Sequence, residues 1–184
     1  MPGTFTPAQM FDHELNPVKG WPSPYANDKV KPIDPTETLT ILSGRVCYIT
    51  PTDVIRMGCP YTSGDALAPM PLFAWPNSSD FDVRTDVGNI AGGNMMGLPA
   101  SPQYELETPE FQGVGFLPNI PLLVDSGGVV PADRGMVKAG SLLTAGLAAL
   151  EHLVVGIVSD SGPLTNSNRK EVVRFWPAYL PVRV

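Results

Sequence analysis

The sequence predicts an all-β protein, either a small β-barrel or a β-sandwich, with an extended proline-rich arm at its N-terminus. The first observation is composition: 18 glycines and 21 prolines lie in 184 residues, well above the usual combined share of about 12 per cent. The second is that 43% of the residues are hydrophobic and only 16% are charged. The third is spacing, because short apolar runs recur about every ten to fifteen residues with turn residues between them. This spacing favours a sandwich or barrel over a βαβ fold.

Residues 1–35 are predicted to form the extended arm, and residues 36–184 the β-barrel or β-sandwich body. Seven prolines in the arm remove backbone donors and disfavour helices and central strands. Large apolar side chains lie between these prolines, and the expected partner-binding anchors are Phe5, Phe11, Trp21 and Tyr25. A segment without a core of its own but with such anchors is expected to lie on its own body or on a neighbouring subunit. A loose tail is the alternative.

In the body, residues 38–50 are rich in β-branched residues and predict a strand, with Gly44 at a bend or bulge. Residues 54–57 are expected to return beside it. Further strands are expected at 71–75, 81–84, 104–107, 122–124, 129–130, 136–144, 152–159 and 171–176, the last continuing beyond Pro177. The glycine-rich residues 88–102 predict a long loop, and residues 147–153 a short helix.

The bulk properties exclude several classes of function. The net charge is −6 and no basic block occurs, so nucleic-acid binding has no electrostatic basis. No apolar run approaches about 18 residues, so no membrane span is expected. The N-terminus lacks the basic and apolar regions of a signal peptide.

No catalytic, cofactor-binding or metal site is expected. The two histidines, His13 and His152, and the two cysteines, Cys47 and Cys59, have no recognised zinc spacing. The cysteines are expected to be reduced, and a disulfide across a hairpin is the alternative. The acidic cluster at residues 80–86 lacks a calcium-loop pattern, and glycine-rich residues 88–97 lack a phosphate-binding signature.

Five stretches of the chain carry a resemblance to a known class of protein. They are residues 43–46, 70–83, 104–111, 154–160 and 174–181. Together they resemble virion structural proteins of tailed bacteriophages, of the head-decoration or cement type. The resemblance implies a small β-barrel or β-sandwich on the outer surface of an icosahedral head, made in the host cytoplasm, with no catalysis and with an N-terminal arm on the coat.

The partners that follow from this resemblance are the major capsid protein and further copies of the chain. A homotrimer at local threefold positions is expected, because three coat subunits meet there, and a dimer at twofold positions is the alternative. Two other functions stay open. One is a tail, collar or baseplate component. The other is a carbohydrate-binding module carried by Trp75, Trp176 and nearby aspartates.

Overall fold

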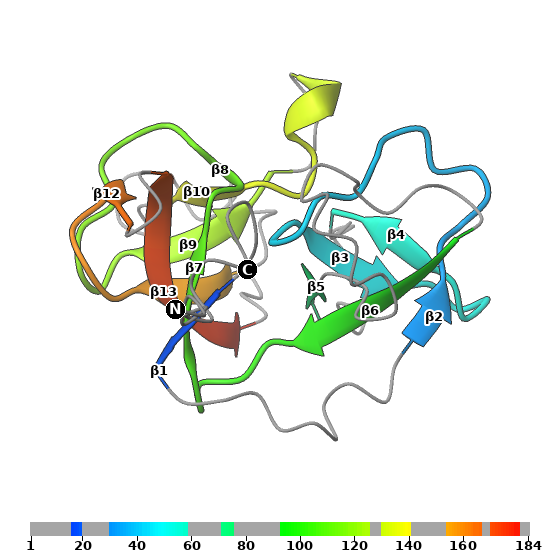
Figure 1. Ribbon diagram of the computed structural model, residues 1–184, viewed down its shortest axis with the longest axis horizontal. Helices are drawn as coiled ribbons and strands as arrows, with labels where there is room; N and C mark the ends of the chain where they lie inside the picture. Colours follow the sequence, from blue (N-terminus) through cyan, green and yellow to red (C-terminus); the bar gives the residue numbers. More distant parts are fainter. Residues whose placement is uncertain are drawn as a thin grey trace, which may run out of the picture.

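The protein folds into two β-sheets that lie side by side. The computed structural model describes residues 16–19, 30–58, 71–75, 93–125, 130–140, 154–166 and 170–180. In these parts the regular elements are strands and one 3-10 helix, η3 (Pro131–Asp133), which confirms the predicted all-β class. Figure 1 shows the sheet that contains β13, called sheet A, on the left and the sheet that contains β5, called sheet B, on the right. Neither sheet closes into a complete barrel, so the arrangement is sandwich-like.

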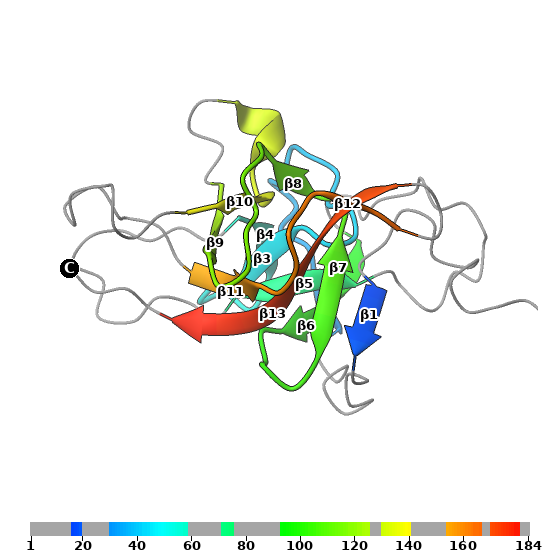
Figure 2. The ribbon, with the colours of Figure 1, turned by 90° about the vertical axis from the view of Figure 1, so that its left-hand side faces the viewer.

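Sheet A has eight strands, and only the pairing of β10 with β8 is parallel. The main path runs β1-β7-β13-β11-β9-β10-β8, and β12 pairs with β13 outside it. The strands are β1 (Asn16–Lys19), β7 (Glu105–Thr108), β8 (Phe111–Gln112), β9 (Pro121–Val124), β10 (Val137–Ala139), β11 (Val154–Val158), β12 (Leu164–Thr165) and β13 (Glu171–Leu180). Figure 2 shows the long strand β13 with β7 and β11 on either side. The predicted continuation of this strand beyond Pro177 is confirmed.

Sheet B has five antiparallel strands in the order β2-β6-β5-β3-β4. The strands are β2 (Val30–Pro32), β3 (Val46–Ile49), β4 (Ile55–Met57), β5 (Leu72–Trp75) and β6 (Asn94–Pro99). The predicted return of residues 54–57 beside the first body strand is confirmed, with Cys47 opposite Met57. Directly after β2, Ile33 forms a parallel bridge with Ile55 of β4. The two edges of sheet B therefore approach each other around a core.

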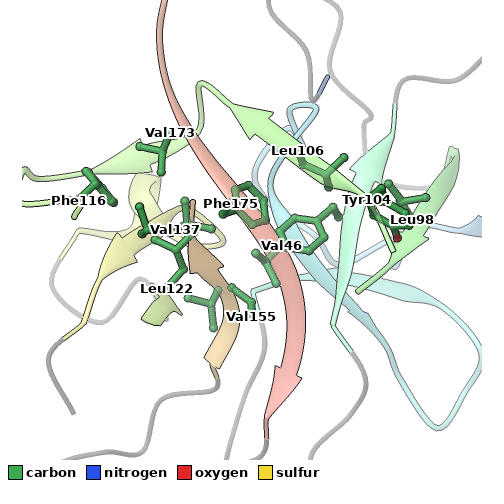
Figure 3. Packing of buried hydrophobic residues seen from close by; sticks show 13 residues of the cluster. Val46, Leu98, Tyr104, Leu106, Phe116, Leu122, Val137, Val155, Val173 and Phe175 are labelled. Atoms are coloured by element: carbon green, nitrogen blue, oxygen red, sulfur yellow. The ribbon is translucent and has the colours of Figure 1, made fainter. Parts of the chain in front are cut away.

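The hydrophobic core has two parts, one on each face of sheet B. The larger cluster lies between the sheets, and its central contact joins Phe73 of β5 to Phe175 of β13, with ring centroids 5.2 Å apart. Figure 3 shows Phe175 in the middle of this cluster, with Phe116 and Leu122 on one side and Tyr104 on the other. The smaller cluster lies within sheet B and consists of Ile33, Ile41, Cys47, Ile55, Met57, Leu72, Ala74 and Met95. Strand β5 is therefore buried on both faces, which explains its continuous apolar sequence.

The predicted long loop over residues 88–102 is wrong for Asn94–Pro99, which form β6 at the centre of three strands. Glycine suits this strand at position 97, because a Cβ there would lie 2.9 Å from Cδ1 of Leu72. Met95 and Leu98 are both fully buried, in the smaller and the larger cluster respectively. Packing on both faces thus outweighs the weak local strand preference of a glycine-containing sequence.

Two further predictions need correction. The strand expected over residues 38–50 begins only at Val46, because Gly44 adopts a φ of +89° and turns the chain, as its predicted bend requires. Val130 is not in a strand beside β9, since Pro131 starts η3 directly after it. Instead, β10 pairs with β9. The strand expected at 81–84 and the helix expected at 147–153 lie outside the described residues.

Candidate interaction surface

The four predicted anchors, Phe5, Phe11, Trp21 and Tyr25, lie outside the described residues. The described parts of the N-terminal segment are strands. In sheet A, β1 pairs with β7 at one edge, and in sheet B, β2 pairs with β6 at one edge. The proline-rich segment is therefore tied to an outer edge of each sheet, and its predicted anchors lie next to these strands in the sequence.

Of the other candidate residues, some lie outside the described residues and some lie inside them. His13, His152 and Cys59 lie outside the described residues, as do residues 80–86. Cys47 is fully buried in β3, and its Sγ lies 3.8 Å from the carbonyl oxygen of Arg45. The two tryptophans proposed for a sugar platform lie in different sheets, Trp75 in β5 and Trp176 in β13.

The outer strands β1 and β2 carry features that oppose pairing with another strand. In β1, Pro17 has no backbone N–H, and the register is irregular between Pro17 and Lys19. In β2, Pro32 likewise has no backbone N–H, and Lys31 adds a charged side chain that disfavours strand addition. Such residues are typical of edges that are protected from strand addition.

The edge of β4 is occupied by the chain that follows β2. The backbone N–H of Asp34 donates to the carbonyl of Ile55 at 2.9 Å, and the N–H of Met57 donates to Oε2 of Glu37 at 3.2 Å. Hydrogen bonds from the hydroxyl and the N–H of Thr36 lower the pKa of Asp34 below its ordinary value. These contacts use the polar groups that a partner strand would need.

A buried cluster of charged side chains joins the two sheets. Arg45, just before β3, donates from Nε to Glu110 Oε2 at 2.5 Å, and its side chain is 7% exposed. Its Nη1 donates to the carbonyls of Ala132 and Arg134 at 2.7 and 2.8 Å. The side chain of Arg134 in turn pairs with Glu37. A planar guanidinium suits this role, since its fixed donors serve several acceptors at once.

This charged cluster fixes the base of a projection formed by η3. Figures 1 and 2 both show η3 standing out from the body. Besides the contacts of Arg45, Nε2 of Gln112 donates to Asp133 Oδ2 at 2.7 Å. Val130, at the start of the projection, exposes 44% of its surface.

The β8–β9 loop, residues 113–120, carries the two most exposed large hydrophobic side chains of the described chain. Val114 is 81% exposed and Leu117 is 55% exposed. Gly113 and Gly115 flank Val114 with φ values of +82° and +88°. Such values favour glycine, and the chain bends at Gly113 and Val114.

The same loop is anchored to the body at its middle and end. Phe116 is fully buried and packs edge-on against Phe111, with centroids 5.5 Å apart. The N–H of Gly162 donates to the carbonyl of Phe116 at 2.8 Å, and the N–H of Asn119 donates to the carbonyl of Val158 at 2.9 Å. A buried residue between two exposed apolar residues makes the loop a defined projection, and it is the candidate interaction surface.

This loop is not among the sites predicted from the sequence. A signal was present, since Val114 stands between two glycines and Leu117 precedes Pro118. Apolar residues inside a turn sequence are unusual for a solvated loop. What the sequence could not show is which of Val114, Phe116 and Leu117 points into the core.

Among the described residues, no group of three or more histidine, cysteine, aspartate or glutamate side chains is placed to hold a metal ion. Within the same ranges, no helix is long and apolar enough to cross a bilayer. Burial raises the pKa of Tyr104 to about 12, and its hydroxyl donates to the carbonyl of Pro99, which is a structural role in the core.

Comparison of the chain with protein-family models, with curated proteins and with solved structures found no match in any of the three.

Proposed function

We propose that this chain is a bacteriophage head-decoration protein, which binds the outer surface of the major capsid protein lattice and stabilises the head. The observation that carries the proposal is the attachment of the proline-rich segment to the edges of both sheets through β1 and β2. The segments with large aromatic side chains adjoin these edge strands in the sequence. The resemblance to head-decoration proteins adds the identity of the partner.

The proposed mechanism is additive burial on a repeated surface. The fifteen residues before β1 include Phe5 and Phe11, and when extended they span about 50 Å. Aromatic side chains bury about 150 Å² or more each, which offsets part of the entropy lost when a segment becomes ordered. A homotrimer at threefold positions presents three such segments, and binding of the second and third is then intramolecular.

Stabilisation of the head follows from mass action. A protein that binds the assembled shell but not the dissociated coat subunits shifts the equilibrium towards the shell in proportion to occupancy. The buried Arg45–Glu110 ion pair joins the two sheets and suits this role, because a firmly packed body transmits the contacts of its binding segments. No chemical step is required.

The test uses bare phage heads, assembled without this chain, from the virus that encodes it. We expect the added chain to co-sediment with these heads, to appear on their outer surface by cryo-electron microscopy, and to raise their resistance to heat. Deletion of residues 1–15 keeps β1 and β2, and is expected to weaken binding while the body stays folded. A longer deletion would remove both edge strands and the buried Ile33.

Two results would contradict the proposal. One is density for the chain on the tail, collar or baseplate alone, which would make it another virion component. The other is failure to bind heads together with specific binding on a glycan array, which would favour a carbohydrate-binding module.

Substitution of Phe5, Phe11, Trp21 and Tyr25 by alanine, one at a time, identifies which anchors contribute to the binding of heads.

A further inference from the structure

We propose that the β8–β9 loop is a second docking site, in which Val114 and Leu117 insert into an apolar recess of a coat subunit. This inference rests on the proposed function, but it concerns a different part of the chain from the N-terminal anchors. It assigns a role to the two most exposed large hydrophobic side chains of the described residues, at 81% and 55% exposure.

The loop is pre-organised for binding. Gly113 and Gly115 adopt left-handed conformations on either side of Val114, and Phe116 is fully buried. Backbone hydrogen bonds tie Phe116 and Asn119 to the body at 2.8 and 2.9 Å. A loop that is already ordered loses little entropy when it binds. Exposed apolar side chains on an ordered loop therefore contribute most of their burial to affinity.

The absence of charged residues in the loop favours a protein partner over a membrane surface. Residues 111–124 contain no charged side chain, in a chain of net charge −6. Interfacial membrane segments rely on lysine and arginine beside their apolar residues, and this loop has neither. An uncharged apolar projection instead fits a recess on a protein surface, where its affinity depends little on salt.

The small apolar area of the loop favours the coat lattice over a second copy of this chain as its partner. A stable interface buries roughly 800 Å² on each partner. Two aliphatic side chains supply only a small part of that area, so this loop does not hold two copies together by itself. As one contact among several on a repeated coat surface, it gains from avidity.

The experiment compares three full-length chains on bare heads by co-sedimentation. They are the wild type, the double variant Val114→Ser/Leu117→Ser, and the matched control Val130→Ser, which removes an exposed valine from the η3 projection. All three sites are exposed, so unchanged circular dichroism and melting temperature are expected. We expect the double variant to bind heads about tenfold more weakly, a typical effect of losing an interface anchor, and the control to bind like the wild type. The ratio is expected to persist at high salt.

The outcomes separate the inference from the proposed function. If the wild type binds heads and the double variant binds equally well, the docking role of the loop is overturned while the proposed function stands. If the wild type does not bind heads, both are overturned. If sedimentation velocity shows a wild-type oligomer that the double variant cannot form, the occupant is a second copy, and the assignment to a coat subunit is wrong.

Discussion

Removal of the Arg45 side chain is expected to be among the most destabilising single changes in the described part of the protein. Arg45 donates three hydrogen bonds, to Glu110 and to the carbonyls of Ala132 and Arg134, at 2.5 to 2.8 Å. Its side chain is only 7% exposed and that of Glu110 is 13% exposed. Arg45→Ala therefore leaves a carboxylate and two carbonyls with little access to water.

The magnitude follows from this burial. Removing one partner of a buried ion pair costs about 3–5 kcal/mol, because the other charge loses its compensation. Glu110→Ala is expected to cost less, about 1–3 kcal/mol, since the guanidinium keeps both carbonyl acceptors. Arg45→Lys is expected to fall between wild type and Arg45→Ala, because an ammonium lacks the planar fork that reaches all three acceptors. A domain of this size has a total stability of about 5–15 kcal/mol, so the loss is large.

The assay is equilibrium urea unfolding followed by far-ultraviolet circular dichroism, with the slope m compared between variants. Lys31→Ala is the matched control. It breaks the pair with Asp53, whose side chains are 27% and 66% exposed, and is expected to cost less than about 1 kcal/mol. The reasoning is refuted if Arg45→Ala costs no more than this control, or less than Glu110→Ala. If Arg45→Ala does not fold, the loss of unfolding free energy in Arg45→Lys is compared with that in Lys31→Ala. A loss no larger than that of Lys31→Ala then refutes the reasoning.

The other predictions concern the backbone and the core. Gly44→Ala is expected to cost about 2–4 kcal/mol in urea unfolding, since φ is +89° and a Cβ would collide with the hydroxyl of Thr108. Gly113→Ala, at φ +82° with open space around it, is expected to cost only about 1 kcal/mol, and equal costs would contradict the collision. The raised pKa of Tyr104, about 12, lies above the unfolded value near 10, so its contribution to stability is complete below about pH 10 and is lost as the pH rises to about 12. Tyr104→Phe is expected to reduce this alkaline loss when the unfolding free energies of both proteins are measured from pH 9 to 12, and an unchanged slope would count against it.

The sequence predicted those elements whose local pattern and tertiary environment agree. Residues 54–57 return beside β3 because Pro51 ends the first run and short apolar residues follow it, and the pairing of Cys47 with Met57 matches this. In β13, β-branched and aromatic residues favour a strand throughout, and the strand continues through Pro177. The predicted turn at Gly44 also agrees with its left-handed conformation.

The sequence failed where long-range packing decides the outcome. Strand β6 contains Gly97, and only the close approach of Leu72 from β5 shows why glycine is needed in a strand there. One partner of β9 is β10, which follows a segment that contains η3. Nothing in the sequence near Val130 indicates that Arg45 binds the carbonyls of Ala132 and Arg134. Contacts between residues 45 and 132 or 134 cannot be read from spacing or composition.

The candidate site was hidden for the same reason. Val114, Phe116 and Leu117 have similar hydrophobicity, and a sequence pattern does not distinguish the buried one from the two exposed ones. The distinction depends on Phe111 and Gly162, which hold Phe116 in place from β8 and from the segment before β12. Exposed apolar residues become informative only when the core is known.

The sheet edges and the β8–β9 loop have different roles in the proposed binding of a partner. Pro17 and the irregular register that follows it oppose strand addition at β1, and Lys31 and Pro32 do so at β2. Asp34 and Glu37 occupy the edge of β4. A protein that assembles at high local concentration on a lattice needs such edges, because open strands would pair with neighbouring copies. In the proposed function, binding is left to side chains on loops and on the segments next to the edge strands. Specific contact with the head lattice and resistance to unspecific sheet growth would then be provided by different parts of the same chain.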